Sequence, residues 1–266
     1  MFQLRNIGAA FAALFVFSPL AAQESAQEWA RECDIGNRRS ESHCEVREYT
    51  IEATGSLRVD AAPNGGIRVY AWDRNEVKVV ARVGAWDDTS EDAKELAASV
   101  KVEAGRGDIR ASGPSTRGRR GWFVEYEIWT PGRTDLRLSS TNGGLDVEGI
   151  SGRLNLETTN GGIHLDAVSG DVDAETTNGG INVILDGRQW EGAGLRAHTT
   201  NGSVRINVPE GFNADLEAST TNGGMDFDFP VTVQGRLHHR IRTKLGDGGP
   251  LLSLSTTNGS VAVRRR

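Results

Sequence analysis

The chain has few cysteines, no excess of basic residues and no long apolar run beyond its first residues. Two cysteines occur among 266 residues, and 30 Lys and Arg stand against 36 Asp and Glu, so the formal net charge is −6. An acidic chain lacks the basic face that nucleic-acid binding requires. Without a second apolar stretch of about 20 residues, no membrane-spanning helix is expected after the N-terminal segment. The 33 glycines follow no triplet period, which excludes collagen.

The motifs of common catalytic sites are also missing. The sequence has no Gly-x-Ser-x-Gly elbow, and the spacing of its Ser, His and Asp residues suggests no triad. Calcium-binding β-rolls need an Asp at a fixed place after their glycines, but His164, Arg205 and Ala262 stand at such places here. We therefore expect no enzyme, no metal and no cofactor. An enzyme that acts on envelope polysaccharide, with acidic residues along one face, is the alternative.

The first 22 residues are typical of a secretory signal peptide. Arg5 supplies the positive charge, residues 7–17 form the apolar region, and cleavage is expected after Ala22. A membrane anchor is the less favoured alternative, because the apolar run is far shorter than the roughly 20 residues of a bilayer span. We therefore expect a periplasmic protein, or one that is secreted or displayed at the cell surface.

The two cysteines lie close together in the sequence. Cys33 and Cys44 are separated by ten residues, and in an exported chain such a pair predicts a disulfide. Closing a loop of this size stabilises a fold by roughly 2–3 kcal/mol. A metal site that includes His43 is less favoured, because adjacent residues rarely both point at one ion. We assign residues 23–54 to an N-terminal cap that carries the disulfide, and residues 55–266 to a repeat domain.

A short motif, Thr-Asn-Gly followed by Gly or Ser, recurs six times in the second half of the chain. The spacings between its asparagines are 18, 18, 23, 21 and 36 residues, and the last is interpreted as two periods with a degenerate copy between them. Residues 63–66 are a weaker, earlier copy. Asn-Gly is expected to supply the positive φ angles of a tight turn. The predicted turn residues are Asn142, Gly143, Asn160, Gly161, Asn178, Gly179, Asn201, Gly202, Asn222, Gly223, Asn258 and Gly259.

Apolar and polar residues alternate between these turns. Leu154, Leu156 and Thr158, for example, alternate with Asn155 and Glu157, which predicts half-buried strands. The near-identity of residues 18 apart favours coils stacked on one another. We therefore predict an all-β fold, a right-handed parallel β-solenoid of about 18-residue, two-strand coils. The alternative is an antiparallel meander, which would need a separate cover for one face.

Two segments interrupt the pattern. Residues 89–98 begin with a capping Thr and early acids, which predicts one short helix. Residues 113–121 form a predicted loop in which Arg117, Arg119 and Arg120 lie beside Trp122. Arg side chains recognise phosphate and carboxylate well. These three residues are therefore a candidate anion-binding site for an envelope glycan or lipid head group, with a solvated loop as the alternative.

The segments that lead into the motif carry a family resemblance. Pro131-Gly132 precedes residues 135–144, Val208-Pro209-Glu210-Gly211 leads to the copy at 221–224, and Gly246-Asp247-Gly248-Gly249 precedes the last copy. Over about residues 50–264 the chain resembles the bacterial "putative adhesin" β-strand-repeat family, a domain of unknown function. The resemblance implies a non-catalytic envelope protein that acts as a binding or structural module. Its partner would be an envelope glycan, lipid head group or protein, and a scaffold without a ligand is a further alternative.

Overall fold

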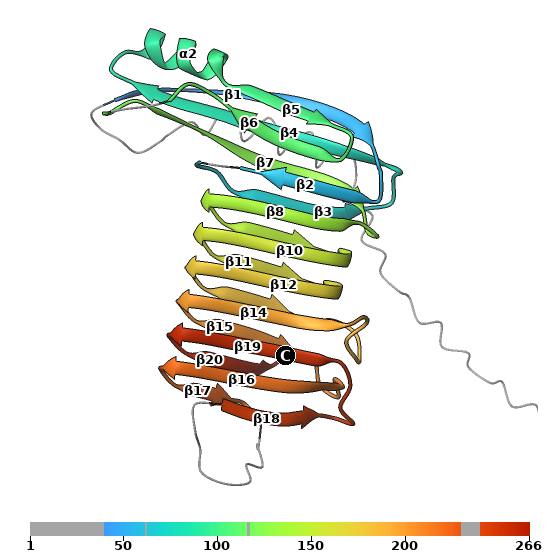
Figure 1. The fold of residues 1–266 in the computed structure, drawn as a ribbon. Coiled ribbons are helices and arrows are strands. Elements are labelled where there is room, and N and C mark those ends of the chain that lie inside the picture. Colours follow the sequence, from blue (N-terminus) through green and yellow to red (C-terminus); the bar gives the residue numbers. More distant parts are fainter. Residues whose placement is uncertain (1–39, 62, 116–117, 230–239) are drawn as a thin grey trace, which may run out of the picture.

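The computed structural model describes residues 40–61, 63–115, 118–229 and 240–266. In these residues, two mostly parallel ten-stranded sheets face each other, and one short helix lies at one end of the stack (Figure 1). The predicted all-β class is confirmed. The signal peptide, Cys33 and Arg117 lie outside the described residues, so the cleavage site and the disulfide stay predictions. The right-handed sense and the domain boundary at residue 54 also stay predictions.

The strands of both sheets are stacked along one common axis. Sheet A contains, in spatial order, β1 (Glu41–Glu52), β4 (Glu76–Asp87), β7 (Gly121–Pro131), β3 (Ile67–Trp72), β9 (Leu145–Glu148), β11 (Ile163–Asp166), β13 (Ile181–Ile184), β15 (Val204–Val208), β20 (Val261–Arg265) and β17 (Met225–Phe227). Sheet B contains, from the opposite end, β18 (Arg240–Leu245), β16 (Ala214–Asn222), β19 (Leu251–Asn258), β14 (Gly194–Asn201), β12 (Ser169–Asn178), β10 (Ser151–Asn160), β8 (Asp135–Asn142), β2 (Ser56–Asp60), β6 (Asp108–Ser112) and β5 (Lys101–Gly105).

Each coil gives one strand to each sheet. In sheet B, Leu154 of β10 lies between Leu136 of β8 and Val172 of β12, in parallel register. In sheet A, β9, β11 and β13 pair in the same way. Residues 18 apart are therefore neighbours along these coils, as the repeat predicted, and the antiparallel meander is wrong for the repeat region.

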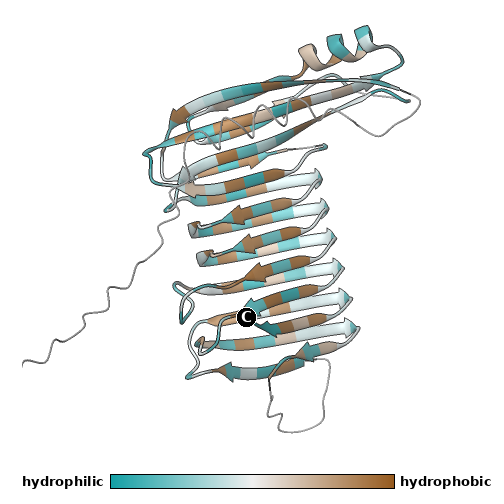
Figure 2. Ribbon diagram, turned by 180° about the vertical axis from the view of Figure 1, so that it is seen from behind, coloured by the Kyte–Doolittle hydropathy of each residue, from teal (hydrophilic) through white to brown (hydrophobic). Residues whose placement is uncertain are grey.

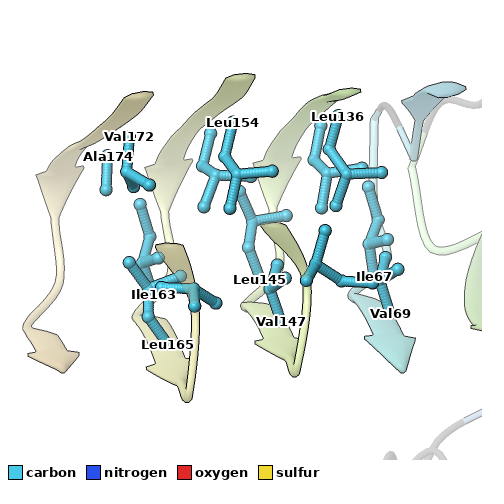
Figure 3. Packing of buried hydrophobic residues seen from close by; sticks show 14 of the residues in the cluster. Ile67, Val69, Leu136, Leu145, Val147, Leu154, Ile163, Leu165, Val172 and Ala174 are labelled. Atoms are coloured by element: carbon cyan, nitrogen blue, oxygen red, sulfur yellow. The ribbon is translucent and has the colours of Figure 1, made fainter. Parts of the chain in front are cut away.

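The core fills the space between the two sheets. Alternate residues of every coil point inward, and the hydropathy colouring of Figure 2 shows apolar and polar residues alternating along the strands. Figure 3 shows the inward side chains of successive coils in rows, including Leu136, Leu154 and Val172 from sheet B and Ile67, Leu145 and Ile163 from sheet A. Each fully buried aliphatic side chain contributes roughly 1.5–3 kcal/mol, so the stack supplies its own core.

The first and last coils of the chain do not lie at the ends of the stack. The β2/β3 coil lies between β6/β7 and β8/β9. The β19/β20 coil lies between β14/β15 and β16/β17. The interpretation of the 36-residue spacing as a hidden copy is therefore wrong, since this interval contains β18, which pairs antiparallel with β16. Every coil presents the same corner to its neighbours, so the motif does not specify which coil lies next.

Antiparallel strands and the helix close the end of the stack near β1, called the N-terminal end below. β4 pairs antiparallel with β7, β1 with β4, and β5 with β6. The predicted helix is confirmed as α2 (Ser90–Ser99), and the Thr89 hydroxyl caps it by accepting a hydrogen bond from the Asp92 amide at 3.1 Å. The helix packs on β4 and β1. Arg47 of β1 donates to the carbonyls of Ala97 and Val100 at its C-terminus, where a cation complements the helix dipole.

Candidate binding groove

The Thr-Asn-Gly corners stack into a continuous asparagine ladder. At each step, Nδ2 of one asparagine donates to Oδ1 of the asparagine in the adjacent coil, at 2.8–2.9 Å. At the N-terminal end, Asn64 Nδ2 donates to the carbonyl of Trp122 at 3.3 Å. In spatial order, the ladder in the described residues consists of Asn222, Asn258, Asn201, Asn178, Asn160, Asn142 and Asn64.

The glycine after each asparagine is needed for close approach between coils. A Cβ on Gly143, Gly161 or Gly179 would lie 2.0 Å from the carbonyl oxygen of the corner glycine in the next coil. None of these three has a φ in the left-handed region. The prediction that Asn-Gly supplies a positive φ is therefore wrong at these corners. Glycine is required at these corners because the backbones of adjacent coils lie too close together to leave room for a Cβ.

Buried hydroxyls form a second ladder beneath the asparagines. Thr158 and Thr176 donate to the carbonyls of Gly143 and Gly161 at 2.9 and 2.8 Å, and both threonines are buried. Stacking removes these carbonyls from water, and a buried carbonyl without a hydrogen-bond donor would lower the stability of the fold. The hydroxyls supply that donor. In the sequence, this role is marked by a Ser or Thr two places before the asparagine of each Thr-Asn-Gly motif. The interpretation of the motif as a turn did not assign a role to that residue. Ser140, Thr199, Thr220 and Thr256 make the same bond.

A shallow groove runs along the outer face of sheet A beside these corners. One section, the groove head, encloses about 510 Å³ and is lined by Asn64, Gly65, Gly66, Ile67, Arg68, Trp86, Phe123, Glu125, Tyr126, Asn142, Gly143, Gly144 and Asp146. A second section, the groove tail, encloses about 530 Å³ and is lined by Gly144, Asp146, Gly162, Ile163, His164, Gly180, Ile181, Asn182, Ser203, Val204, Arg205, Ser260 and Ala262. The two sections share Gly144 and Asp146, so they form one continuous surface.

The floor of the groove is open because the fourth motif residue is small. Gly66, Gly144, Gly162, Gly180 and Ser203 occupy equivalent outward places in successive coils. At Gly144 a Cβ would lie 3.4 Å from the carbonyl of Gly162. The backbone at this corner therefore tolerates a side chain, as Ser203 shows, and its absence keeps the groove open.

One polar side chain from each coil borders the floor. Arg68, Asp146, His164, Asn182 and Arg205 follow one another in register across the sheet. Arg68 lies 3.4 Å from Glu127 and 3.8 Å from Asp146. Asn182 Nδ2 lies 2.9 Å from His164 Nδ1, and because an amide nitrogen only donates, Nδ1 is the acceptor in this pair. The row therefore begins with an oppositely charged pair, continues with an imidazole and an amide, and ends with a second arginine.

Two aromatic rings form the wall of the groove head. Trp86 lies opposite Gly121, and Phe123 lies opposite Gly84, across the β4–β7 pair. A Cβ on Gly121 would lie 2.2–2.7 Å from three adjacent atoms of the Trp86 ring, and one on Gly84 would lie 2.1–3.0 Å from three atoms of the Phe123 ring. These similar distances place each ring face-on against the glycine. Both rings are half-buried and lie flat on the sheet.

The predicted basic loop lies near this wall. Arg119 lies 3.1 Å from Asp88, and Arg120 lies 3.4 Å from Asp87. Both arginines of this loop that the structure describes thus already have a carboxylate partner. Arg117 lies outside the described residues, so an anion site built from all three stays a prediction. Cys44 lies on β1 opposite Gly84.

Fold and groove define a solenoid-like β-repeat protein with a polar groove across one sheet. The sequence profile of the Toastrack DUF4097 family matches residues 96–264. The chain belongs to this family, which confirms the family resemblance. In the described residues, no helix is long and apolar enough to cross a membrane.

Several solved structures are similar to this chain. A "putative cell adhesion protein" from Clostridium sporogenes is 13% identical with a TM-score of 0.44, over 85% of this chain and 100% of the other. A "putative adhesin" from Bacteroides fragilis is 10% identical with a TM-score of 0.45, over 84% and 97%. A "putative lipid binding protein" from Parabacteroides distasonis is 11% identical with a TM-score of 0.27, over 83% and 96%. None of the curated proteins compared with the chain matches it.

Proposed function

We propose that this protein is a non-catalytic, exported binding module of the bacterial envelope, and that its partner lies in the groove along sheet A. The observation that carries the proposal is the continuity of the groove head and tail across successive coils. Repeat proteins commonly bind along such extended surfaces. The fold keeps this floor clear with glycine or serine at each corner, while charged and amide groups follow its border.

A binding assay with one groove-filling variant tests the proposal. Residues 23–266 would be immobilised and exposed to glycan, lipid and protein fractions of a bacterial envelope. Gly144→Gln places a side chain where the two groove sections meet. Gly224→Gln is the matched control, because Gly224 is the equivalent corner residue beyond the groove and a Cβ there would meet nothing within 4 Å.

The expected result is that wild type and Gly224→Gln retain the same fraction, and that Gly144→Gln loses it with an unchanged melting temperature. Retention of no fraction would overturn the proposal, and so would equal retention by both variants.

A second candidate is a polysaccharide-active enzyme, favoured by one observation. Asp146 and His164 are opposite each other in the register of β9 and β11, and both line the groove tail. Release of new reducing ends from the retained glycan, abolished in His164→Ala, would support this candidate over the binding module.

A further inference from the structure

The head of the groove contains a half-buried tryptophan ring. The backbone of β7 at Gly121 covers one side of the Trp86 ring, and the residue itself lines the groove and is half-buried. The face of an aromatic ring is negative, whereas the C–H groups on the flat side of a pyranose are weakly positive. A glycine beneath the ring is what allows it to lie flat enough for such stacking.

The polar groups around Trp86 are balanced in charge. Arg68 and Asp146, each 45% exposed, lie 3.8 Å apart, and Glu125 is paired with Arg82. Amide groups of Asn64 and Asn142 also line this section. A paired set of donors and acceptors suits a neutral ligand whose groups both donate and accept hydrogen bonds, as hydroxyls do. A lipid phosphate would instead require cations without carboxylate partners.

The position of the groove also disfavours a peptide. An extended peptide commonly binds by adding a strand to an open sheet edge. The strands beneath the groove, including β3, β9 and β11, are interior strands of sheet A with neighbours on both sides. A ligand here must bind through side chains and ring faces. Along the groove, successive coils are about 4.8 Å apart.

We infer that the groove head binds an extended, neutral β-1,4-linked glycan, with one pyranose ring stacked on Trp86 and the chain continuing over Gly144 and Gly162. A β-1,4-linked glycan is straight and ribbon-like, which matches a groove that crosses successive strands in register. Arg68, Asp146 and the amides of Asn64 and Asn142 would bind the hydroxyls along the edges of the ribbon. This inference rests on the proposed function and names the chemical class of its partner.

Titration with defined oligosaccharides tests it. Hexamers of β-1,4-linked glucose and of β-1,4-linked N-acetylglucosamine would be titrated into residues 23–266 by calorimetry. We expect saturable binding of at least one hexamer, weakened at least tenfold in Trp86→Ala. The control is Trp72→Ala, which removes another half-buried tryptophan from sheet A outside the groove, and which should bind like wild type.

A second pair of variants adds a side chain to the groove and removes no packed side chain. Gly144→Gln should also weaken hexamer binding at least tenfold, while Gly224→Gln should not. Binding of neither hexamer by the folded wild type would overturn the inference, as would wild-type affinity in Trp86→Ala and Gly144→Gln.

The two proposals fail separately. If the envelope assay retains a protein or lipid fraction in a way that Gly144→Gln abolishes, but neither hexamer binds, the glycan inference is wrong and the binding module stands. If no envelope fraction and no hexamer binds, both are wrong.

Discussion

The two ends of the stack close their sheets with very different amounts of structure. At the N-terminal end, sheet A continues through the 12-residue strands β4 and β1, and α2 packs on both. At the C-terminal end, sheet B adds only the six-residue β18, and sheet A stops at the three-residue β17. Open edges invite pairing with other chains, and antiparallel caps or very short edge strands reduce that risk.

Both ends share one device despite this difference. At the N-terminal end, the β2/β3 coil lies one place inward and the later β6/β7 coil is outermost. At the C-terminal end, the β19/β20 coil lies one place inward and the earlier β16/β17 coil is outermost. At the N-terminal end the outermost coil is held by long antiparallel strands. At the C-terminal end, the coil β16/β17 is held mainly by β18 and by the inserted β19/β20. The C-terminal end therefore depends on its inserted coil more than the N-terminal end does.

Deleting one element at each end should give the largest contrast. Removing residues 251–266 leaves β14/β15 and β16/β17 without the coil that joins them, so we expect aggregation or loss of cooperative unfolding. Removing residues 1–52 takes away an edge strand, so we expect a lower melting temperature with a retained cooperative transition. Calorimetry and size-exclusion chromatography measure both. Equal behaviour of the two deletions would refute the asymmetry.

Corner glycines at the two ends should be equally intolerant of a side chain. A Cβ on Gly65 would lie 1.8 Å from the Val124 carbonyl, and one on Gly223 would lie 1.7 Å from the Gly259 carbonyl. We expect Gly65→Ala and Gly223→Ala each to lower the free energy of unfolding by about 3 kcal/mol, the upper end of overpacking costs. Gly224→Ala is the control, with an expected change near zero. Urea denaturation measures all three, and a harmless Gly223→Ala would contradict the stacked-corner explanation.

The predicted disulfide would strengthen only the N-terminal end. Cys33→Ser should lower stability by roughly 2–3 kcal/mol in oxidising buffer, because the closed loop no longer restricts the unfolded chain. The same variant should match wild type under reductant. Melting temperatures in the two buffers decide this, and an equal decrease in both would remove the disulfide.

Acid should loosen the C-terminal edge by a small amount. A hydrogen bond from Arg264 is the main cause that lowers the pKa of Asp228 below its ordinary value of 3.8. Because the folded-state pKa is the lower one, this contribution is present above pH 3.8 and is lost as the pH falls through the lowered value. Hydrogen exchange of β17 and β20 should thus differ between wild type and Asp228→Asn at pH 6 and converge at low pH. A difference that persists unchanged in acid would contradict this role.

The sequence predicts the repeating parts of the fold and leaves out the parts set by distant contacts. Alternation in residues 154–158 places their strand, the 18-residue spacing gives its register, and Thr89 marks the start of the helix. The order of coils at both ends was not predictable, since identical corners stack equally well. The pairing of Trp86 with Gly121 depends on the register between β4 and β7, where no repeat exists. The aromatic wall of the groove could therefore not be predicted from the sequence repeat.

The inserted β19/β20 coil makes the joining of its two neighbouring coils wait for residues 251–266. Synthesis from the N-terminus delivers β19 and β20 after β14–β17. Until then the facing sides of β14/β15 and β16/β17 have no strand between them, and their joining awaits contacts between segments far apart in sequence, which form slowly. The joining of these two coils therefore waits until β19 and β20 have emerged.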